Sequence, residues 1–197
     1  MRPGGGSIRT RGVPVAAALI AATTVLAGTA GAVGSRSYAD RAGDSDRGRA
    51  PDVTSTRVTS DAGTVTFRIS LRNRRALKPG DFITVELDVD QNAQTGCDTF
   101  GAEYALAVLG HYGEMTRAFG RCVGGRWDFS RRRAPLKARY ASRTLDLTVK
   151  RAALAASSGF DFRIGASWHA YDAVYYDFAP DSGAPAWSYA FSSRGAP

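Results

Sequence analysis

Strict alternation of apolar and polar residues is the feature that most constrains how this chain can fold. In residues 64–71, TVTFRISL, every second residue from Val65 to Leu71 is apolar and those between are polar. The same period recurs in residues 82–90, 144–149 and 160–168. A two-residue period places the apolar side chains on one face of a β-strand, so we expect strands with one buried and one wet face.

The rest of the ordered chain also favours β-structure. Residues 103–109 and 115–122 flank the turn-like sequence GHYG at 110–113, which predicts a hairpin. Only residues 151–156 have a helix-favouring composition, and they suffice for about one and a half turns. Short strands at close intervals predict an all-β fold, an antiparallel β-sandwich of jelly-roll type with one short helix.

The N-terminal 32 residues have the layout of a secretory signal peptide. Arg2, Arg9 and Arg11 precede an uncharged run from Gly12 to Ser35, and AGA at 30–32 supplies the small residues that signal peptidase accepts. We expect cleavage after Ala32, a secreted protein and no stable membrane insertion afterwards. An uncleaved membrane anchor is the alternative, because the uncharged run is just long enough to span a bilayer.

Composition sets the remaining boundaries. Residues 33–50 mix Arg, Asp, Gly and Ser and predict a disordered linker. Residues 51–191 have the size of one domain, and 192–197 form a tail. The formal charge is +8, and removal of the three arginines of residues 1–32 leaves 23 basic against 18 acidic residues, or +5. This modest surplus comes without a recognition motif, which argues against nucleic-acid binding.

Two cysteines, Cys97 and Cys122, are the only thiols of the chain. An even count in a chain that carries an export signal favours a disulfide. If residues 103–122 form the expected hairpin, Cys122 lies at its open end, where Cys97 can reach it. We therefore expect a structural bridge rather than a redox pair, whose cysteines are usually closer in sequence.

Acidic residues gather between Pro79 and Thr116, where seven Asp and Glu stand without a single Lys or Arg. Asp88, Asp90 and Asn92 follow one another at strand spacing, and Thr95 and Gly96 come next. Oxygen ligands in this arrangement suit Ca²⁺, which takes six to eight oxygens in flexible geometry. The spacing does not match an EF-hand. The alternative is a plain turn capped by Asp and Asn side chains.

Aromatic residues crowd the C-terminal part of the chain. Between Ile164 and Ser193 there is again no Lys or Arg. Rings can stack on sugar faces, and carboxylates accept hydrogen bonds from sugar hydroxyls, so the candidate ligand-binding residues are Trp168, Tyr171, Tyr175, Tyr176 and Asp177. The alternative is that several of these rings fill the core of a small sandwich.

Four motifs resemble landmarks of secreted bacterial β-sandwich domains related to family 9 carbohydrate-binding modules and to DOMON domains: LDVDQNAQTG, GAEYAL, TLDLTVKRAAL and YYDFAPDSG. The resemblance covers residues 51–191. It implies a structural calcium ion held by Asp88, Asp90, Asn92 and Glu103, with Asp177 approaching the same end. It also implies binding of sugars, or of haem in some DOMON domains, rather than catalysis. The chain departs from such sugar binders in lacking a clear pair of sandwiching tryptophans.

Three functional classes follow. We favour an exported, non-catalytic module that binds a polysaccharide or another cell-envelope component. A secreted glycan hydrolase is an alternative, which would need two carboxylates across a cleft, such as Asp172 and Asp177. Neither His111 nor His169 lies in a GxSxG or HExxH motif. Haem binding is the third, with Met115, His111 and His169 as the available axial ligands.

Overall fold

The computed structural model describes residues 34–98, 100–112, 114–129, 136–156 and 158–192. These residues form twelve strands and two short 3-10 helices, and all named strand pairs are antiparallel. The predicted all-β fold is confirmed. The expected signal peptide and the last five residues lie outside the described residues.

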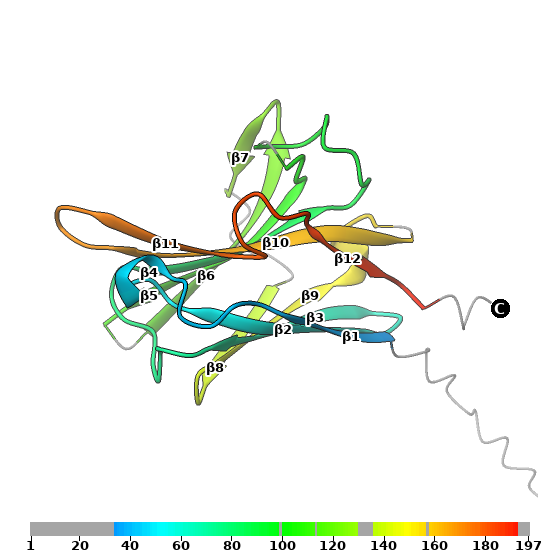
Figure 1. Ribbon diagram of the computed structural model, residues 1–197. Helices are drawn as coiled ribbons and strands as arrows, with labels where there is room; N and C mark the ends of the chain where they lie inside the picture. The colour runs from blue at the N-terminus through cyan, green and yellow to red at the C-terminus, as the bar shows by residue number, and fades with distance from the viewer. Residues whose placement is uncertain (1–33, 99, 113, 130–135, 157, 193–197) are drawn as a thin grey trace, which may run out of the picture. The chain divides into compact units, whose positions relative to one another are not determined.

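Two sheets make up the domain. The first has the strand order β1 (Gly34–Ala39), β2 (Val53–Ser60), β3 (Thr64–Leu71), β9 (Thr144–Lys150) and β8 (Leu136–Ala141). The second has the order β11 (Val174–Ala179), β10 (Gly159–His169), β4 (Asp81–Asp88), β5 (Tyr104–His111), β6 (Glu114–Val123) and β7 (Arg126–Asp128), and β12 (Trp187–Ala190) pairs with the first half of β10. Figure 1 shows the two sheets as stacked layers.

The connections between the sheets give the sandwich its jelly-roll character. The chain crosses from the first sheet to the second between β3 and β4, and again between β9 and β10. Because β3 pairs antiparallel with β9 and β4 pairs antiparallel with β10, the two crossings lie at opposite ends of the sandwich. This wrapping places the ends of strands that are far apart in sequence at the same rim of the sandwich.

The core lies between the sheets and is built from the predicted inward rows. The inward residues of β3 are fully buried, and the same holds for most of the inward rows of β4, β9 and β10: Val65, Phe67, Ile69, Leu71, Ile83, Val85, Leu87, Leu145, Leu147, Val149, Phe160, Phe162 and Ile164. Phe67 packs against Phe160 and Phe162 with ring centroids 5.7 and 5.5 Å apart. The alternation in the sequence therefore identified the core face of each of these strands.

Three local predictions differ from the structure. Part of the predicted linker is ordered: β1 pairs along β2, and Tyr38 is buried against Phe162 and Trp187, which holds the strand in place. A 3-10 helix, η1 (Asp46–Gly48), follows β1. The domain thus includes residues from at least Gly34, well before Pro51. The helix expected at 151–156 is a 3-10 helix of three residues, η2 (Arg151–Ala153).

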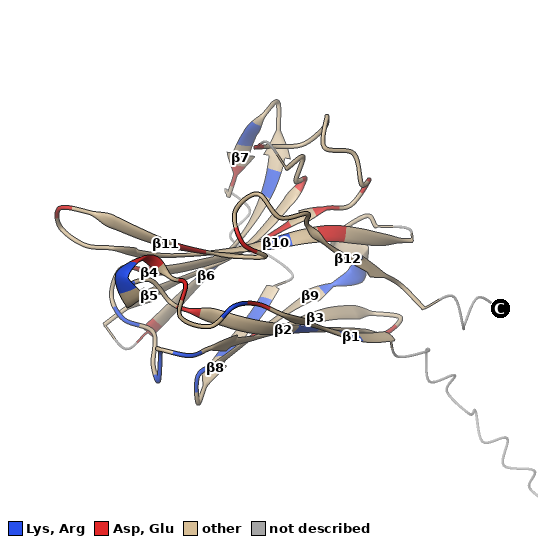
Figure 2. Ribbon diagram, in the orientation of Figure 1, with Lys and Arg blue, Asp and Glu red and all other residues tan. Residues whose placement is uncertain are grey.

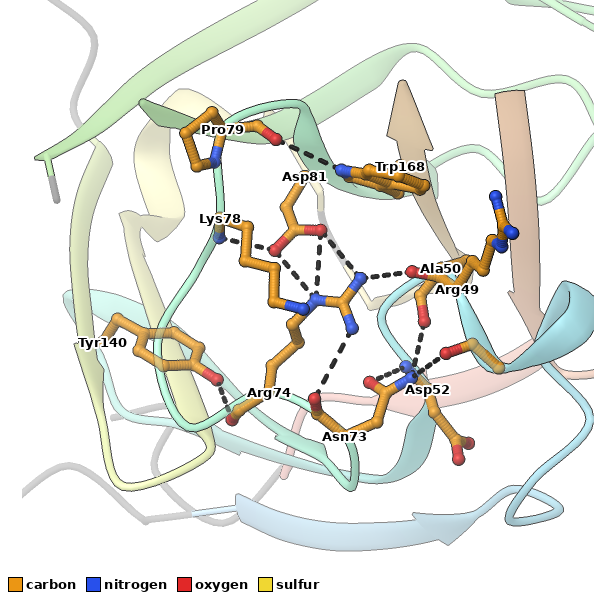
Figure 3. A network of polar contacts seen from close by, with 11 residues as sticks. Arg49, Ala50, Asp52, Asn73, Arg74, Lys78, Pro79, Asp81, Tyr140 and Trp168 are labelled. Carbon is orange, nitrogen blue, oxygen red and sulfur yellow. Dashed lines mark hydrogen bonds and ion pairs between the residues drawn. The ribbon is translucent and has the colours of Figure 1, made fainter. Parts of the chain in front are cut away.

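Buried charge supports the crossing from β3 to β4. Arg74 and Asp81 are 3% and 0% exposed, and the guanidinium donates to both carboxylate oxygens at 2.9–3.1 Å. Arg74 also donates to the carbonyl oxygen of Arg49, and its own carbonyl accepts from the Tyr140 hydroxyl. Figure 3 shows how this network joins the crossing to the segment before β2.

Within the described residues, no helix is long and apolar enough to cross a membrane.

Candidate functional site

The loop after β4 brings three acidic side chains together. One carboxylate oxygen from each of Asp88, Asp90 and Glu103 lies within 4.8 Å of the others. Asp88 ends β4 and Glu103 precedes β5, and the Glu103 amide donates to the Leu87 carbonyl at 2.9 Å, so strand pairing places the two acids side by side. The structure thus unites three of the four residues predicted to hold calcium. We call them the β4-loop cluster.

A single hydroxyl group faces this cluster. The Thr95 Oγ1 atom lies 3.0 Å from Asp90 Oδ2, 3.0 Å from Glu103 Oε1 and 2.9 Å from the Asn92 carbonyl oxygen. A hydroxyl carries one proton and can donate to only one of these acceptors. The cluster therefore contains more acceptor oxygens than donors, which is the situation that a bound cation relieves.

Asn92 forms hydrogen bonds within the loop. Its side-chain oxygen accepts from the Gln94 amide at 3.1 Å, and its own amide donates to Asp88 and Asp90. These are the side-chain-capped turns that the alternative interpretation anticipated. The turn is present in the structure, and it leaves the three carboxylates converging on one point.

No cation from the described residues forms an ion pair with the β4-loop cluster. Burial raises the pKa of Asp88 to about 6, and repulsion from Glu103 and contact with Asp90 act in the same direction, against a hydrogen bond from the Asn92 amide. The arginines that the structure describes therefore leave this negative charge uncompensated.

The predicted disulfide is confirmed and lies beside this loop. Cys97 and Cys122 are joined with their Cα atoms 5.5 Å apart, and Cys97 is buried. Cys97 also forms an isolated antiparallel bridge with Ala102. The Cys122 amide donates to the Glu103 carbonyl at 2.8 Å. The bridge thus ties the acidic loop to β6.

A second acidic cluster, which the sequence analysis did not identify, lies where β1, β2 and β11 meet. Asp44 contributes to two groups of three carboxylates, one with Asp40 and Asp181 and one with Asp52 and Asp177. We call these five residues the Asp44 cluster. Figure 2 shows the acidic positions on β11 and on the segment between β1 and β2.

Backbone hydrogen bonds position the Asp44 cluster. The Gly43 amide donates to both carboxylate oxygens of Asp52 at 3.1 and 3.0 Å, which folds the segment after β1 back onto the start of β2. The Val53 amide donates to Asp177 Oδ2 at 2.7 Å and so joins β2 to β11. Asp52 and Asp177 are both buried.

Burial and mutual repulsion perturb these acids. Burial is the largest cause that raises the pKa of Asp40 to about 7, followed by repulsion from Asp44 and Asp181. Burial also raises the pKa of Asp177 to about 7, with repulsion from Asp44 adding to it against a hydrogen bond from the Val53 amide. A carboxylate whose charge is balanced by an arginine would show the opposite shift.

The two clusters are separate. In the register of β10, Asp88 lies opposite Asp161, whereas Asp177 lies opposite Ala166, five residues further along. That offset is about 17 Å along the strand, at about 3.3 Å per residue. Asp177 therefore does not approach the β4-loop cluster, contrary to what the family resemblance implied.

The predicted ligand-binding residues are divided among different surfaces. Trp168 and Tyr175 stack on each other with ring centroids 5.7 Å apart, and Arg49 covers the Tyr175 ring. Tyr171 is fully exposed between β10 and β11, and Asp177 is buried in the Asp44 cluster. Of the five, only Tyr176 lies exposed on the outer face of β11, where it stacks on Phe178 at 5.9 Å.

A groove of about 310 Å³ lies beside Phe178 on the outer face of the second sheet. Two aromatic rings, Phe100 and Phe178, and three charged residues, Glu86, Asp98 and Arg163, contribute to its lining. Burial raises the pKa of Glu86, with repulsion from Asp98 adding to it against the attraction of Arg163. The Nε atom of Arg163 is buried without a hydrogen-bond partner among the described residues. Rings combined with a few polar groups are typical of sites for small polar ligands.

The remaining candidates occupy strand ends. His111 is exposed at the end of β5, and His169 ends β10, where its Nε2 atom lies 3.1 Å from Ser167 Oγ. Met115 is partly buried against the core. Asp172 is exposed in the turn before β11, whereas Asp177 is buried on the inner face of β11. The two carboxylates therefore do not face each other across one cleft.

Comparison with protein-family models, with curated proteins and with solved structures gave no match. The likeness to family 9 carbohydrate-binding modules and DOMON domains therefore rests on the four short motifs alone.

Proposed function

We propose that this chain is an exported, non-catalytic β-sandwich module, stabilised by calcium at the β4-loop cluster, that binds a polysaccharide or another cell-envelope component. One observation carries the metal part of the proposal. Asp88, Asp90 and Glu103 converge within 4.8 Å, with the Thr95 hydroxyl between Asp90 and Glu103, and no ion pair from the described residues balances them. Carboxylate and carbonyl oxygens are the ligands that Ca²⁺ prefers.

Thermal unfolding tests the metal part. Calcium added to chelator-stripped protein is expected to raise the melting temperature, because a ligand that binds only the folded state stabilises it by about 2.7 kcal/mol at one hundred times its Kd. Asp90→Asn keeps an oxygen that accepts from the Asn92 amide and Thr95 but removes the charge, so we expect a smaller rise for this variant. Asp172→Asn removes a charge from an exposed turn and is the matched control.

An Asp90→Asn variant that responds to calcium exactly as the unaltered protein does would remove the β4-loop cluster from the proposal. A response lost in the Asp172→Asn control would point to a general charge effect instead.

The groove beside Phe178 supports the ligand part of the proposal. Its rings offer apolar surfaces for the faces of sugar rings, while the Glu86 carboxylate and the Arg163 guanidinium offer an acceptor and donors for hydroxyl groups. Tyr176 extends this aromatic surface along β11.

Binding to a panel of bacterial and plant polysaccharides tests the ligand part. Phe178→Ala is expected to weaken binding about tenfold or more, because burial of a phenylalanine ring contributes about 1.5–3 kcal/mol. Val123→Ala, at an exposed apolar residue at the end of β6, is the control. Two results would contradict a carbohydrate ligand at this face. Phe178→Ala and Val123→Ala could bind every polysaccharide equally well, or the unaltered protein and both variants could bind none of them.

A further inference from the structure

We propose a second calcium site, centred on the carboxylate of Asp44, that fastens the segment between β1 and β2 to β11 and to the turn that follows it. The inference goes beyond the proposed function, because it concerns a different set of residues and does not depend on the β4-loop cluster.

The spacing of the Asp44 cluster fits a calcium ion. The ligand oxygens of Asp44, Asp40 and Asp181 lie within 4.8 Å of one another, and the same holds for Asp44, Asp52 and Asp177. Ca²⁺ binds oxygens at about 2.3–2.6 Å, so two ligands on opposite sides of one ion are about 5 Å apart. Each group of three carboxylates can therefore bind a calcium ion, and the Asp44 carboxylate is a ligand in both groups.

Unpartnered oxygens at the centre of the cluster point to a ligand. Both carboxylate oxygens of Asp44 and the Oδ2 atom of Asp40 are buried, and none of them has a hydrogen-bond donor among the described residues. Buried polar atoms in folded proteins almost always have a partner, and a buried carboxylate without one is costly. A hard cation satisfies such oxygens where the protein supplies no donor.

The charge balance leads to the same conclusion. Among the described residues, one guanidinium forms an ion pair with the five carboxylates: Arg72 lies 3.8 Å from Asp52, and its side chain is 59% exposed. A hollow of about 320 Å³, lined in part by Asp44, Asp177 and Asp181, gives an ion access from the surface.

Calorimetric titration of the chelator-stripped full chain with calcium at pH 7.5 tests the site. We expect Asp44→Asn to lose one class of calcium binding and to keep the class that Asp90→Asn removes, while the Asp172→Asn control keeps both. If the β4-loop cluster binds no calcium, Asp90→Asn will change nothing and Asp44→Asn will still lose binding. The two proposals can thus fail separately.

The melting temperature, measured with and without calcium, distinguishes metal binding by Asp44 from a purely structural role. Without calcium, Asp44→Asn is expected to melt at or above the temperature of the unaltered protein, because it removes repulsion from four neighbouring acids. With saturating calcium the order should reverse. If Asp44→Asn does not fold, Asp181→Asn serves in its place, because Asp181 is exposed at the rim of the hollow.

Calcium binding by Asp44→Asn equal to that of the unaltered protein would overturn the proposal. The proposal would also fail if protons, rather than a metal ion, neutralise the carboxylates of the Asp44 cluster. Acids whose pKa in the folded chain is about 7, against 3.8 ordinarily, stabilise the fold at low pH and lose that effect as pH rises from about 4 through 7. A melting temperature that falls over this range and does not respond to calcium would show that protons, not a metal, hold these carboxylates together.

Discussion

Replacement of Arg74 by alanine is expected to lower the free energy of unfolding by about 3–5 kcal/mol. The substitution leaves the Asp81 carboxylate, which is fully buried, without the guanidinium that donates to both of its oxygens. Of the donors that the structure describes, only the Lys78 amide, at 2.7 Å, would still donate to it. The same change removes donors to the backbone carbonyls of Arg49 and Asn73, which loosens the crossing from β3 to β4 (Figure 3). Chemical denaturation at neutral pH measures the loss.

A matched pair on the surface provides the control. Arg68 and Asp146 form an ion pair at 2.8 Å between β3 and β9, but the Arg68 side chain is 61% exposed. Exposed pairs contribute about 0.2–1 kcal/mol, so Arg68→Ala should have a much smaller effect. Equal losses for Arg68→Ala and Arg74→Ala would contradict the role assigned to burial.

Replacement of Cys97 and Cys122 together by alanine is expected to cost roughly 3 kcal/mol of stability, the second large effect. The bridge closes a loop with a sequence separation of 25 residues, and in the chain-entropy picture it acts by restricting the unfolded chain. The effect is measurable as a lower denaturation midpoint of the double variant under non-reducing conditions.

Reduction of the unaltered protein offers an independent check. A reducing agent should lower its stability toward that of the double alanine variant and leave the variant itself unchanged, because the structure contains no free cysteine. A variant as stable as the oxidised protein would show that the bridge does not stabilise the fold.

The strands were predictable from sequence because a two-residue period reports directly which face of a strand is buried. The strand predicted at residues 64–71 has the same bounds in the structure. The predictions of a hairpin around residues 110–113 and of the disulfide are also confirmed. β1 escaped prediction because most of its residues are exposed and polar, and its one buried ring, Tyr38, packs on Phe162 and Trp187, more than a hundred residues away.

The candidate site was predictable only in part. Asp88 and Asp90 are neighbours along one strand end, so their spacing suggested a shared site, whereas Glu103 was expected there only from the family resemblance. In residues 40–52 the aspartates alternate with arginines and glycines, a composition that is typical of a linker. The only local signal was the close spacing of Asp40, Asp44 and Asp46 around a glycine.

The sequence by itself determined the fold class, the core face of the main strands, the cysteine pairing and the shared position of Asp88 and Asp90, because each depends on local periodicity or short spacing. Only the tertiary structure decided that Arg74 and Asp81 are buried together, that the predicted aromatic residues are divided between faces, and that Asp44 meets Asp177. These contacts depend on how the chain crosses between the two sheets. Local periodicity carries no information about which distant side chains such a crossing brings together.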